Sequence, residues 1–404
     1  MTHQLFSKTP CLYCGANQTS HFMTRFDTGL SLGSTKRTER MMRTKIGQLL
    51  YQFVSWLLVL TIKVWKLFGV VKYSTDAEKI KLGRARVLFE EAQARGIPIV
   101  HVMFLGKSTD IFRAYVAGKW MQFQGLPRRT DYENPSLVWM DDKARLKKEL
   151  MRAGIPVPKG GSVKTLYEAL DIFRSVEKPV IVKPRLGSRG RHTTTHIYTE
   201  DELTTAFYIA KEMCPHVIVE EHITGPVWRG TVIDGKLVGV LGGEPPKITG
   251  DGTSTIIELI RMKNETKDTR IKDVVINHLI EDFLQRQGYT YESVLPTDVT
   301  IDLSEKIGIS YGGRSIEVTT ITHPLLKTYL ESAAKVVNDP LLGFDFIVPD
   351  VTKSPDEQKF GIIECNAVPF INLHHYPLIG EPQNVAGALW DYIVAHEEGL
   401  RKKK

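Results

Sequence analysis

Beyond residue 74, short apolar runs rich in β-branched residues alternate with amphipathic segments along the chain. Apolar residues that recur every three or four positions predict helices, and short β-branched runs bounded by Gly or Pro predict strands. This pattern predicts a helix over 76–95 that ends at Gly96, a strand over 97–105 and a hairpin within 111–126. Residues 74–140 are the first part of the sequence in which both helices and strands are predicted. We therefore expect a small α/β unit there.

A larger α+β domain is expected over residues 141–395. Its first helix starts after Asp141 and Asp142, where negative charge suits the helix dipole, and ends at Gly154. Further helices are predicted over residues 165–176, 201–214 and 273–287. Asp234-Gly235 predicts the turn of a hairpin.

The N-terminal region has a different pattern. Residues 1–45 are polar and basic without apolar periodicity, so we expect a poorly ordered terminus. Residues 46–62 then carry no charge, inside a hydrophobic or amphipathic helix expected over 46–73. This length is at the bottom of the range for a membrane span, and the tryptophans and basic flanks suit a helix at a membrane surface better. The alternative is a helix packed on the body of the protein or on a partner, so residues 40–72 are a candidate contact with a membrane surface or a protein.

Composition narrows the class of protein. The chain has 404 residues, enough for two or three domains. The net charge of +7 owes four charges to the end of a basic tail, residues 396–404, which we expect to be solvated. No interleaving of aromatic with basic residues suggests a face for nucleic acid, so no nucleic acid is expected as a partner. Four cysteines are too few for a disulfide scaffold and fit a reducing compartment, so we expect a cytoplasmic protein, with the inner face of the membrane as its docking surface if the apolar helix binds lipid.

Two of the cysteines, Cys11 and Cys14, have the spacing of one half of a zinc knuckle. No second Cys-x-x-Cys follows in the sequence, although His3 and His21 lie nearby. A zinc site, a thiol pair and a poorly ordered terminus without metal all remain open at this stage.

The stretch 180–192 combines an apolar strand with a Gly- and Arg-rich loop. The strand carries Lys183, Pro184 ends it, and Gly187 and Gly190 give the following loop backbone freedom. Such a loop can direct N–H groups into one concavity that suits an anion, so we interpret it as a binding loop for a polyphosphate. The spacing is neither that of a P-loop nor that of a dinucleotide fold. A basic surface turn is the alternative.

Near the end of the chain, acidic side chains stand inside apolar strands. Asp345 lies within 343–348, while Glu364 and Asn366, two positions apart, share one face of a strand at 361–366. Buried acids without partners are costly, and Mg²⁺ takes oxygen ligands of this kind together with substrate phosphate. These residues therefore predict a magnesium site. Pairing of the acids with arginines is the alternative.

Six segments in this order resemble the ATP-grasp superfamily, and within it the nucleotide-binding core of cyanophycin synthetase-like and bifunctional glutathione synthetase-like ligases. The likeness covers about residues 76–395. The segments that carry it are Asp142-Lys143 with the following Ala-Gly-Ile-Pro-Val-Pro, Val182–Gly190, 217–223, 245–260, 364–369 and 381–386. The resemblance implies an ATP-grasp fold, in which two lobes clasp ATP and the smaller lobe spans about 155–222.

The resemblance also implies roles for individual residues. The residues expected to contact the ATP phosphates are Lys143, Lys183, Gly187, Ser188 and Gly190. The residues expected to border the adenine are Glu220, Glu221 and Ile223. The expected ligands of Mg²⁺, or of Mn²⁺ in its place, are Asp345, Glu364 and Asn366. Arg229 and Arg314 would lie near phosphate or the incoming carboxylate.

The implied activity is that of an ATP-dependent carboxylate–amine ligase, which forms an amide through an acylphosphate. Its partners would be a small-molecule carboxylate and an amine, and we expect a homo-oligomer. Two alternatives are an ATP-binding module without turnover that is tethered to a membrane or a partner, and a phosphotransferase. Three positions depart from the pattern of the superfamily: His192 in place of a glycine, Val227 in place of an acid, and Gly242-Gly243 in place of an acid–arginine pair.

Overall fold

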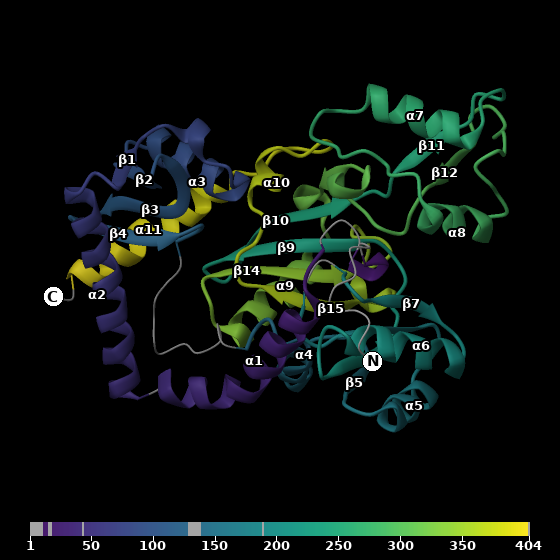
Figure 1. The fold of residues 1–404 in the computed structure, drawn as a ribbon, viewed down its shortest axis with the longest axis horizontal. Helices are drawn as coiled ribbons and strands as arrows, with labels where there is room; N and C mark the ends of the chain where they lie inside the picture. Colours follow the sequence, from purple (N-terminus) through teal and green to yellow (C-terminus); the bar gives the residue numbers. More distant parts are fainter. Residues whose placement is uncertain (1–10, 15–17, 43, 128–138, 188–189, 403–404) are drawn as a thin grey trace.

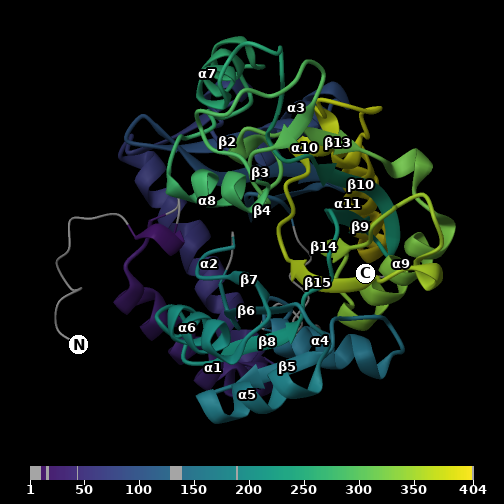
Figure 2. The same cartoon turned by 90° about the vertical axis from the view of Figure 1, so that its right-hand side faces the viewer.

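A computed structural model describes residues 11–14, 18–42, 44–127, 139–187 and 190–402. Figure 1 shows four parts: an N-terminal unit on the left, a large central sheet, a small lobe at the lower right and a further subdomain at the upper right. Turned by 90°, Figure 2 shows the small lobe and this subdomain at opposite ends of the molecule, with the strands of the large sheet beside the space between them.

The N-terminal unit is an antiparallel sheet with one helix from each end of the chain against it. Its strands, in spatial order, are β1 (Val71–Ser74), β2 (Ile99–Phe104), β3 (Lys107–Val116) and β4 (Lys119–Gln124). Phe89 of α3 (Gly83–Ala94), Phe112 of β3 and Trp390 of α11 (Val385–Lys402) share its core. The hairpin predicted within 111–126 is therefore confirmed.

Helix α11 extends into the basic C-terminal segment. Residues 396–402 are helical, Arg401 and Lys402 at the end of the helix are exposed as expected, and Lys119 Nζ lies 2.6 Å from a carboxylate oxygen of Glu397. The helix forms because its apolar residues, including the fully buried Trp390, are needed to close the core of the N-terminal unit.

The expectation of a poorly ordered terminus over residues 1–45 is wrong for α1 (His21–Met42) and lies outside the described residues for 1–10, 15–17 and 43. The apolar side chains Phe22, Phe26 and Leu30 have helical spacing, which the sequence analysis did not use, and all three are exposed on the surface of α1. The helix is held by polar and close contacts to the small lobe instead. The Thr28 hydroxyl donates to the Met213 carbonyl at 3.0 Å, and Gly29 lies against Pro215.

Helix α2 (Lys45–Leu67) contains the uncharged stretch, and it connects α1 to the N-terminal unit (Figure 1). The Thr44 side chain caps its N-terminus, and Ile62 is buried against Val71 and Val102. The helix ends six residues before the predicted limit of residue 73, because Gly69 adopts a φ of +72° and β1 follows. Within the described residues, no helix combines the length and apolar character needed to cross a membrane.

The small lobe is a four-stranded antiparallel sheet covered by two helices. The strand order is β5 (Gly160–Val163), β8 (Val217–Glu221), β6 (Val180–Pro184) and β7 (Thr194–Ile197). The helices are α5 (Leu166–Ser175) and α6 (Glu200–Lys211), each started by a Thr–Glu capping box. They match the two predicted helices to within three residues at each end.

The large sheet has the order β13 (Ser315–Glu317), β10 (Lys236–Gly243), β9 (Val227–Ile233), β14 (Leu341–Ile347) and β15 (Gly361–Asn366). Its core includes residues of α4 (Lys143–Arg152) and α9 (Pro324–Val337), and the short α10 (Asn372–His375) lies beside α3. The predicted hairpin at Asp234-Gly235 is confirmed by β9 and β10.

The remaining subdomain was not distinguished in the sequence. It comprises β11 (Lys247–Thr249), α7 (Ile256–Thr266), α8 (His278–Arg286) and β12 (Thr300–Asp302), around a core of its own. Helix α8 begins five residues after the predicted start of residue 273, because the Asn277 side chain accepts hydrogen bonds from the N–H groups of Leu279 and Ile280 and fixes the first turn.

Candidate functional site

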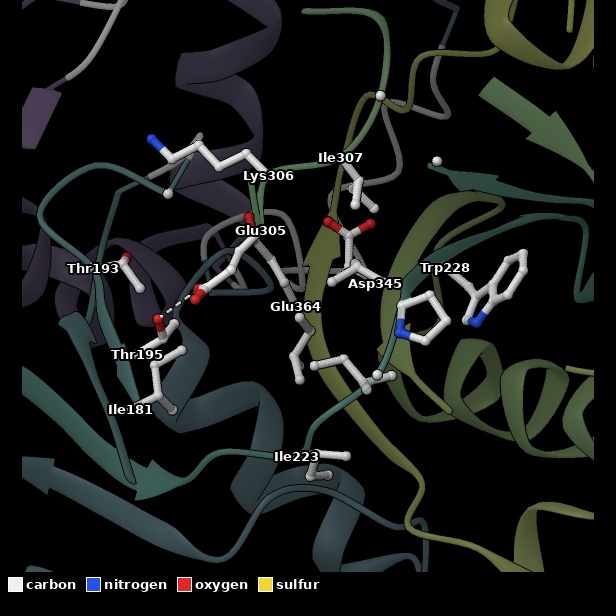
Figure 3. Close-up of a pocket in the computed structure, with 18 of the residues that line it drawn as sticks. Ile181, Thr193, Thr195, Ile223, Trp228, Glu305, Lys306, Ile307, Asp345 and Glu364 are labelled. Carbon is white, nitrogen blue, oxygen red and sulfur yellow. Dashed lines mark hydrogen bonds between the residues drawn. The ribbon is translucent and has the colours of Figure 1, made fainter. Parts of the chain in front are cut away.

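A cavity of about 880 Å³ is lined by residues of the small lobe, the large sheet and the following subdomain. Figure 3 shows the carboxylates of Asp345 and Glu364 on one side of it and Thr193 and Thr195 of the small lobe on the other. Most of the residues singled out in the sequence line this one cavity. They are Lys143, Lys183, Gly187, Gly190, Glu220, Glu221, Ile223, Arg229, Asp345 and Glu364.

Three of these residues form a row across adjacent strands of the large sheet. Arg229 on β9 is paired directly with Asp345 on β14, which is paired with Glu364 on β15. Directly opposite residues on antiparallel strands point to the same face, so the three side chains lie together. The Arg229 guanidinium donates to both carboxylate oxygens of Asp345, at 2.6 and 2.8 Å. Burial alone would lower the pKa of Arg229, but Asp345 raises it overall, so the guanidinium stays charged.

Asn366 joins this row from the same strand as Glu364. Its side-chain amide donates to Asp345 Oδ2 at 3.4 Å. Two carboxylates therefore line one edge of the cavity, and the Asn366 amide, which is not among the described lining residues, lies beside them. All three offer oxygen donors, and Asp345 retains lone pairs beyond those that Arg229 uses.

Lys143 approaches the same edge from α4, where it is the first helical residue after the N-cap Asp142. Its ammonium donates to the Gly187 carbonyl at 2.7 Å and lies 3.7 Å from Glu364 Oε2. Asp142 in turn accepts two hydrogen bonds from Arg185, at 2.7 and 2.6 Å. The start of α4 is thus fixed to the loop that follows β6, and Lys143 spans from this loop to the acidic row.

Glu220 lies buried between two lysines. Lys183 Nζ is 2.7 Å from Glu220 Oε1, and Lys147 Nζ contacts Oε2. Burial alone would raise the pKa of Glu220, but the two ammoniums lower it overall. Burial lowers the pKa of Lys147 to about 7 against the opposing attraction of Glu220, and the nearby charge of Lys183 adds to the lowering.

Lys147 was not identified from the sequence. Its position four residues after Lys143 was a usable signal, since residues i and i+4 share a helix face. Glu220, expected from the resemblance to border an adenine, lines the cavity, and both of its carboxylate oxygens face lysines.

One of the three departures from the superfamily pattern, the glycine pair Gly242-Gly243, has a structural explanation in the wall of the cavity. Gly242 lies directly opposite Trp228, and a Cβ added at Gly242 would come within 2.4 Å of the Trp228 ring. The indole N–H donates to the Val348 carbonyl at 3.0 Å, which fixes the ring in the wall of the cavity. Gly243 allows the backbone of Gly308 to approach in the same way. The glycine pair therefore makes room for an aromatic side chain and a neighbouring loop.

The remaining expected residues lie elsewhere. Arg314 is about half exposed and pairs with Glu244 at 2.9 and 2.6 Å, and it is not among the described residues that line the cavity. Ser188 lies outside the described residues. Val227 lines the cavity, whereas His192 is fully buried and faces the N-terminal segment.

The subdomain contributes the carboxylate of Glu305 to the wall of the cavity, and the sequence did not predict this residue. The Thr195 hydroxyl of β7 donates to Glu305 Oε2 at 3.1 Å, a contact drawn in Figure 3, and Lys306 follows in the same wall. Glu305 is 110 residues from Thr195 in the sequence, so no local pattern could bring the two together. This hydrogen bond links the small lobe to the subdomain across the cavity.

No protein-family model matches the chain. Cyanophycin synthetase of Synechocystis sp. is 34% identical over 261 residues, which are 62% of this chain and 30% of that protein. Cyanophycin synthetase of Geminocystis herdmanii is 33% identical over 346 residues, 81% of this chain and 39% of that protein. Glutathione biosynthesis bifunctional protein GshAB of Clostridium perfringens is 30% identical over 263 residues, 63% of this chain and 34% of that protein. The chain thus spans about a third of the length of the curated relatives it matches.

Among solved structures, a bifunctional glutathione synthetase from Pasteurella multocida superposes with a TM-score of 0.57 at 24% sequence identity, over 78% of this chain and 43% of that one. The likeness supports the same fold. Together with the order of the six sequence segments and the cavity between the lobes, these similarities confirm the resemblance to the ATP-grasp superfamily inferred from the sequence, and the chain has the fold of that superfamily.

Proposed function

We propose that the chain is an ATP-dependent carboxylate–amine ligase that forms an amide through an acylphosphate. The observation that supports this most directly is the arrangement of charge in one cavity, where Lys143 and Lys183 lie near the row formed by Arg229, Asp345 and Glu364. Phosphoryl transfer depends on positioning and charge neutralisation more than on a covalent nucleophile, and this cavity offers both.

The residues present fit a magnesium ion. Asp345 and Glu364 at one edge of the cavity, with Asn366 beside them, offer hard oxygen donors, the ligand type that Mg²⁺ and Mn²⁺ prefer. When bound there, the ion would neutralise phosphate charge. Arg229 would hold Asp345 in a fixed orientation toward it, through its two hydrogen bonds to that carboxylate.

The lysines would hold the phosphates. Lys143 is tied to the Gly187 carbonyl, so an anion bound by the loop after β6 would meet this ammonium. The ion pair with Glu220 holds the Lys183 ammonium in place. The backbone at the end of β8, near Glu221 and Ile223, would border the adenine. In the proposed reaction a substrate carboxylate oxygen attacks the γ-phosphorus as the bond to ADP breaks, and an amine then attacks the acyl carbon as phosphate leaves.

The test is ADP release from the full chain with mixtures of small carboxylates and amines. Glu364→Gln should keep the fold and lower ADP formation by about a hundredfold or more, because a charged oxygen donor is lost. Glu357→Gln, an exposed change in the same lobe, should leave the rate unchanged. Near-normal turnover of Glu364→Gln would remove Glu364 from the site. ATP binding without ADP release would favour the non-catalytic module, and a phosphorylated product without an amide would favour a phosphotransferase.

A second function concerns α2. We propose that it docks the enzyme on an anionic membrane surface. Leu49, Leu50, Phe53 and Trp56 are each more than half exposed in this structure, an apolar face larger than scattered surface residues would give. Exposed basic residues flank it, namely Arg40, Lys45, Lys63, Lys66 and Lys72. Each basic residue near anionic lipid contributes about 1 kcal/mol, so binding should weaken with salt.

Sedimentation with vesicles tests this docking. The full chain should pellet with anionic vesicles and less with neutral ones, and the double variant Leu49→Glu/Phe53→Glu should stay in solution. Tyr167→Glu, which alters an equally exposed side chain on α5, should pellet as the wild type does. Self-association or binding of a second protein that the α2 variant abolishes, without vesicle binding, would refute the membrane assignment.

A further inference from the structure

Four metal-binding side chains meet outside the cavity. Cys11 directly precedes the short 3-10 helix η1 (Leu12–Cys14), Cys14 ends it, His21 begins α1, and His192 lies two residues before β7. One ligand atom from each side chain lies within 4.8 Å of the other three. The candidate His3 of the sequence lies outside the described residues, and His192, 178 positions after Cys14, takes the fourth place.

The distances between these atoms match a tetrahedral metal centre. Bonds of about 2.3 Å to sulfur and about 2.0–2.1 Å to nitrogen, at tetrahedral angles, place sulfur and nitrogen about 3.5 Å apart. The observed separations are 3.5 Å for Cys11 Sγ to His192 Nε2, 3.4 Å for Cys14 Sγ to the same nitrogen, and 3.3 Å for Cys14 Sγ to His21 Nε2. One imidazole nitrogen has one lone pair, so it cannot serve two thiols equally well by hydrogen bonding. A shared metal ion accounts for both contacts.

The far side of each imidazole is also occupied. His192 Nδ1 lies 2.8 Å from the Ile209 carbonyl oxygen, so this nitrogen carries the hydrogen and Nε2 directs its lone pair toward the sulfurs. His21 Nδ1 lies 3.2 Å from Glu212 Oε2, and the same carboxylate oxygen lies 3.7 Å from His192 Nδ1. Metal-binding histidines commonly have a carbonyl or carboxylate at the second nitrogen, where it fixes the tautomer and the ring orientation.

The geometry points to a structural zinc site formed by Cys11, Cys14, His21 and His192, which joins the N-terminal segment to the loop between β6 and β7. Two thiolates and two imidazoles at tetrahedral spacing are a ligand set for zinc, and four protein ligands leave no position for a substrate. Cys14 and His192 are buried, so the site is closed on one side by protein.

The site has a direct consequence for the loop. The backbone N–H of His192 donates to the Tyr13 carbonyl at 3.0 Å. His192 has a φ of +52°, which lies in a region that few residues other than glycine adopt. Gly190, Arg191 and Thr193 beside it line the cavity. Zinc would hold the loop in this conformation, which explains why a histidine stands where the superfamily pattern has glycine. The inference stands on the four ligands alone and does not depend on the proposed ligase activity.

Metal content of the purified full chain tests the proposal. One zinc per chain should remain after dialysis, and Cys14→Ser and His192→Gln should lose it. Cys214→Ala, which removes a buried thiol elsewhere, should keep it. Glu212→Gln should retain zinc but bind it about tenfold more weakly, the usual effect of removing a carboxylate behind a metal-binding histidine.

Cobalt provides a second measurement that does not require the variants to fold. Wild-type chain stripped of zinc and loaded with Co²⁺ should show the intense visible bands of tetrahedral cobalt and a thiolate-to-cobalt charge-transfer band. Folded wild-type chain that holds no zinc and gives no such spectrum would overturn the proposal. Equal zinc loss in Cys214→Ala and Cys14→Ser, or a Cys11–Cys14 disulfide in protein purified without oxidant, would do the same.

Discussion

Replacement of Lys147 by methionine should make the stability of the protein less dependent on pH. Lys147 is buried beside Glu220, with the charges of Lys183 and Lys143 nearby, and its pKa falls to about 7 from an ordinary value of 10.5. Between these two values the unfolded chain binds more protons than the folded one, so the free energy of unfolding rises with pH. The additional stability that neutral Lys147 gives at high pH is therefore lost as the pH falls toward 7, because near that pH Lys147 of the folded protein also binds a proton.

The magnitude follows from the two pKa values. Between pH 7 and pH 9 the wild type should gain about 2 kcal/mol of unfolding free energy relative to Lys147→Met, since each unit of pKa difference corresponds to about 1.4 kcal/mol. Titrating groups that do not interact with Lys147 are common to both proteins and cancel in this difference. Methionine is apolar and has a similar length, so it should fill the same space in α4.

Urea unfolding followed by circular dichroism at pH 7, 8 and 9 measures this difference. Lys148→Met is the matched control, because it makes the same change at the next, exposed position of α4 and should show no added pH dependence. If the difference between the wild type and Lys147→Met is the same at all three pH values, the reasoning is refuted, and Glu220 keeps Lys147 fully charged through this range.

Two further predictions concern the walls of the cavity. Glu220→Gln removes the carboxylate that the buried Lys147 and Lys183 share, and it should cost about 3–5 kcal/mol in urea unfolding below pH 7, where Lys147 is protonated. Glu200→Gln, in an exposed ion pair with Arg174 of the same lobe, should change the stability little, and equal effects of the two variants would show that burial of the pair is not what matters. Gly242→Ala should cost about 1–3 kcal/mol because its Cβ would overlap the Trp228 ring, while Gly399→Ala, where a Cβ meets nothing, should not destabilise; thermal unfolding of both variants checks this, and a neutral Gly242→Ala would show that the ring can move.

Local sequence patterns predicted the parts of the site that lie within single elements. Lys183 at the end of an apolar strand, and Glu364 with Asn366 on one face of another, carried their own signals, and the structure places them around one cavity or beside it. The strand register that aligns Arg229, Asp345 and Glu364 could not be predicted, because strands far apart in the sequence are paired only by the completed sheet.

The same limit applies to α1 and to His192. Helix α1 has no buried apolar stripe, and its contacts to Met213 and Pro215 depend on the folded small lobe. His192 looked like a departure within a glycine loop, and only the fold brings it to Cys11 and Cys14. Residues held by distant polar partners leave little periodic signal in the sequence, whereas buried strands and capped helices leave a clear one.

The C-terminal helix α11 also constrains the order in which the chain folds during synthesis. The Trp390 indole donates to the Leu88 carbonyl, a contact between residues 302 positions apart, and Leu389 and Trp390 complete the core around Phe89 and Phe112. The ribosome releases β1–β4 and α3 long before it releases this helix. The core of the N-terminal unit is therefore completed only near the end of synthesis. Until then its apolar face is open to water and to other chains. The small lobe, whose core lies within residues 163–219, has no such dependence and can fold first.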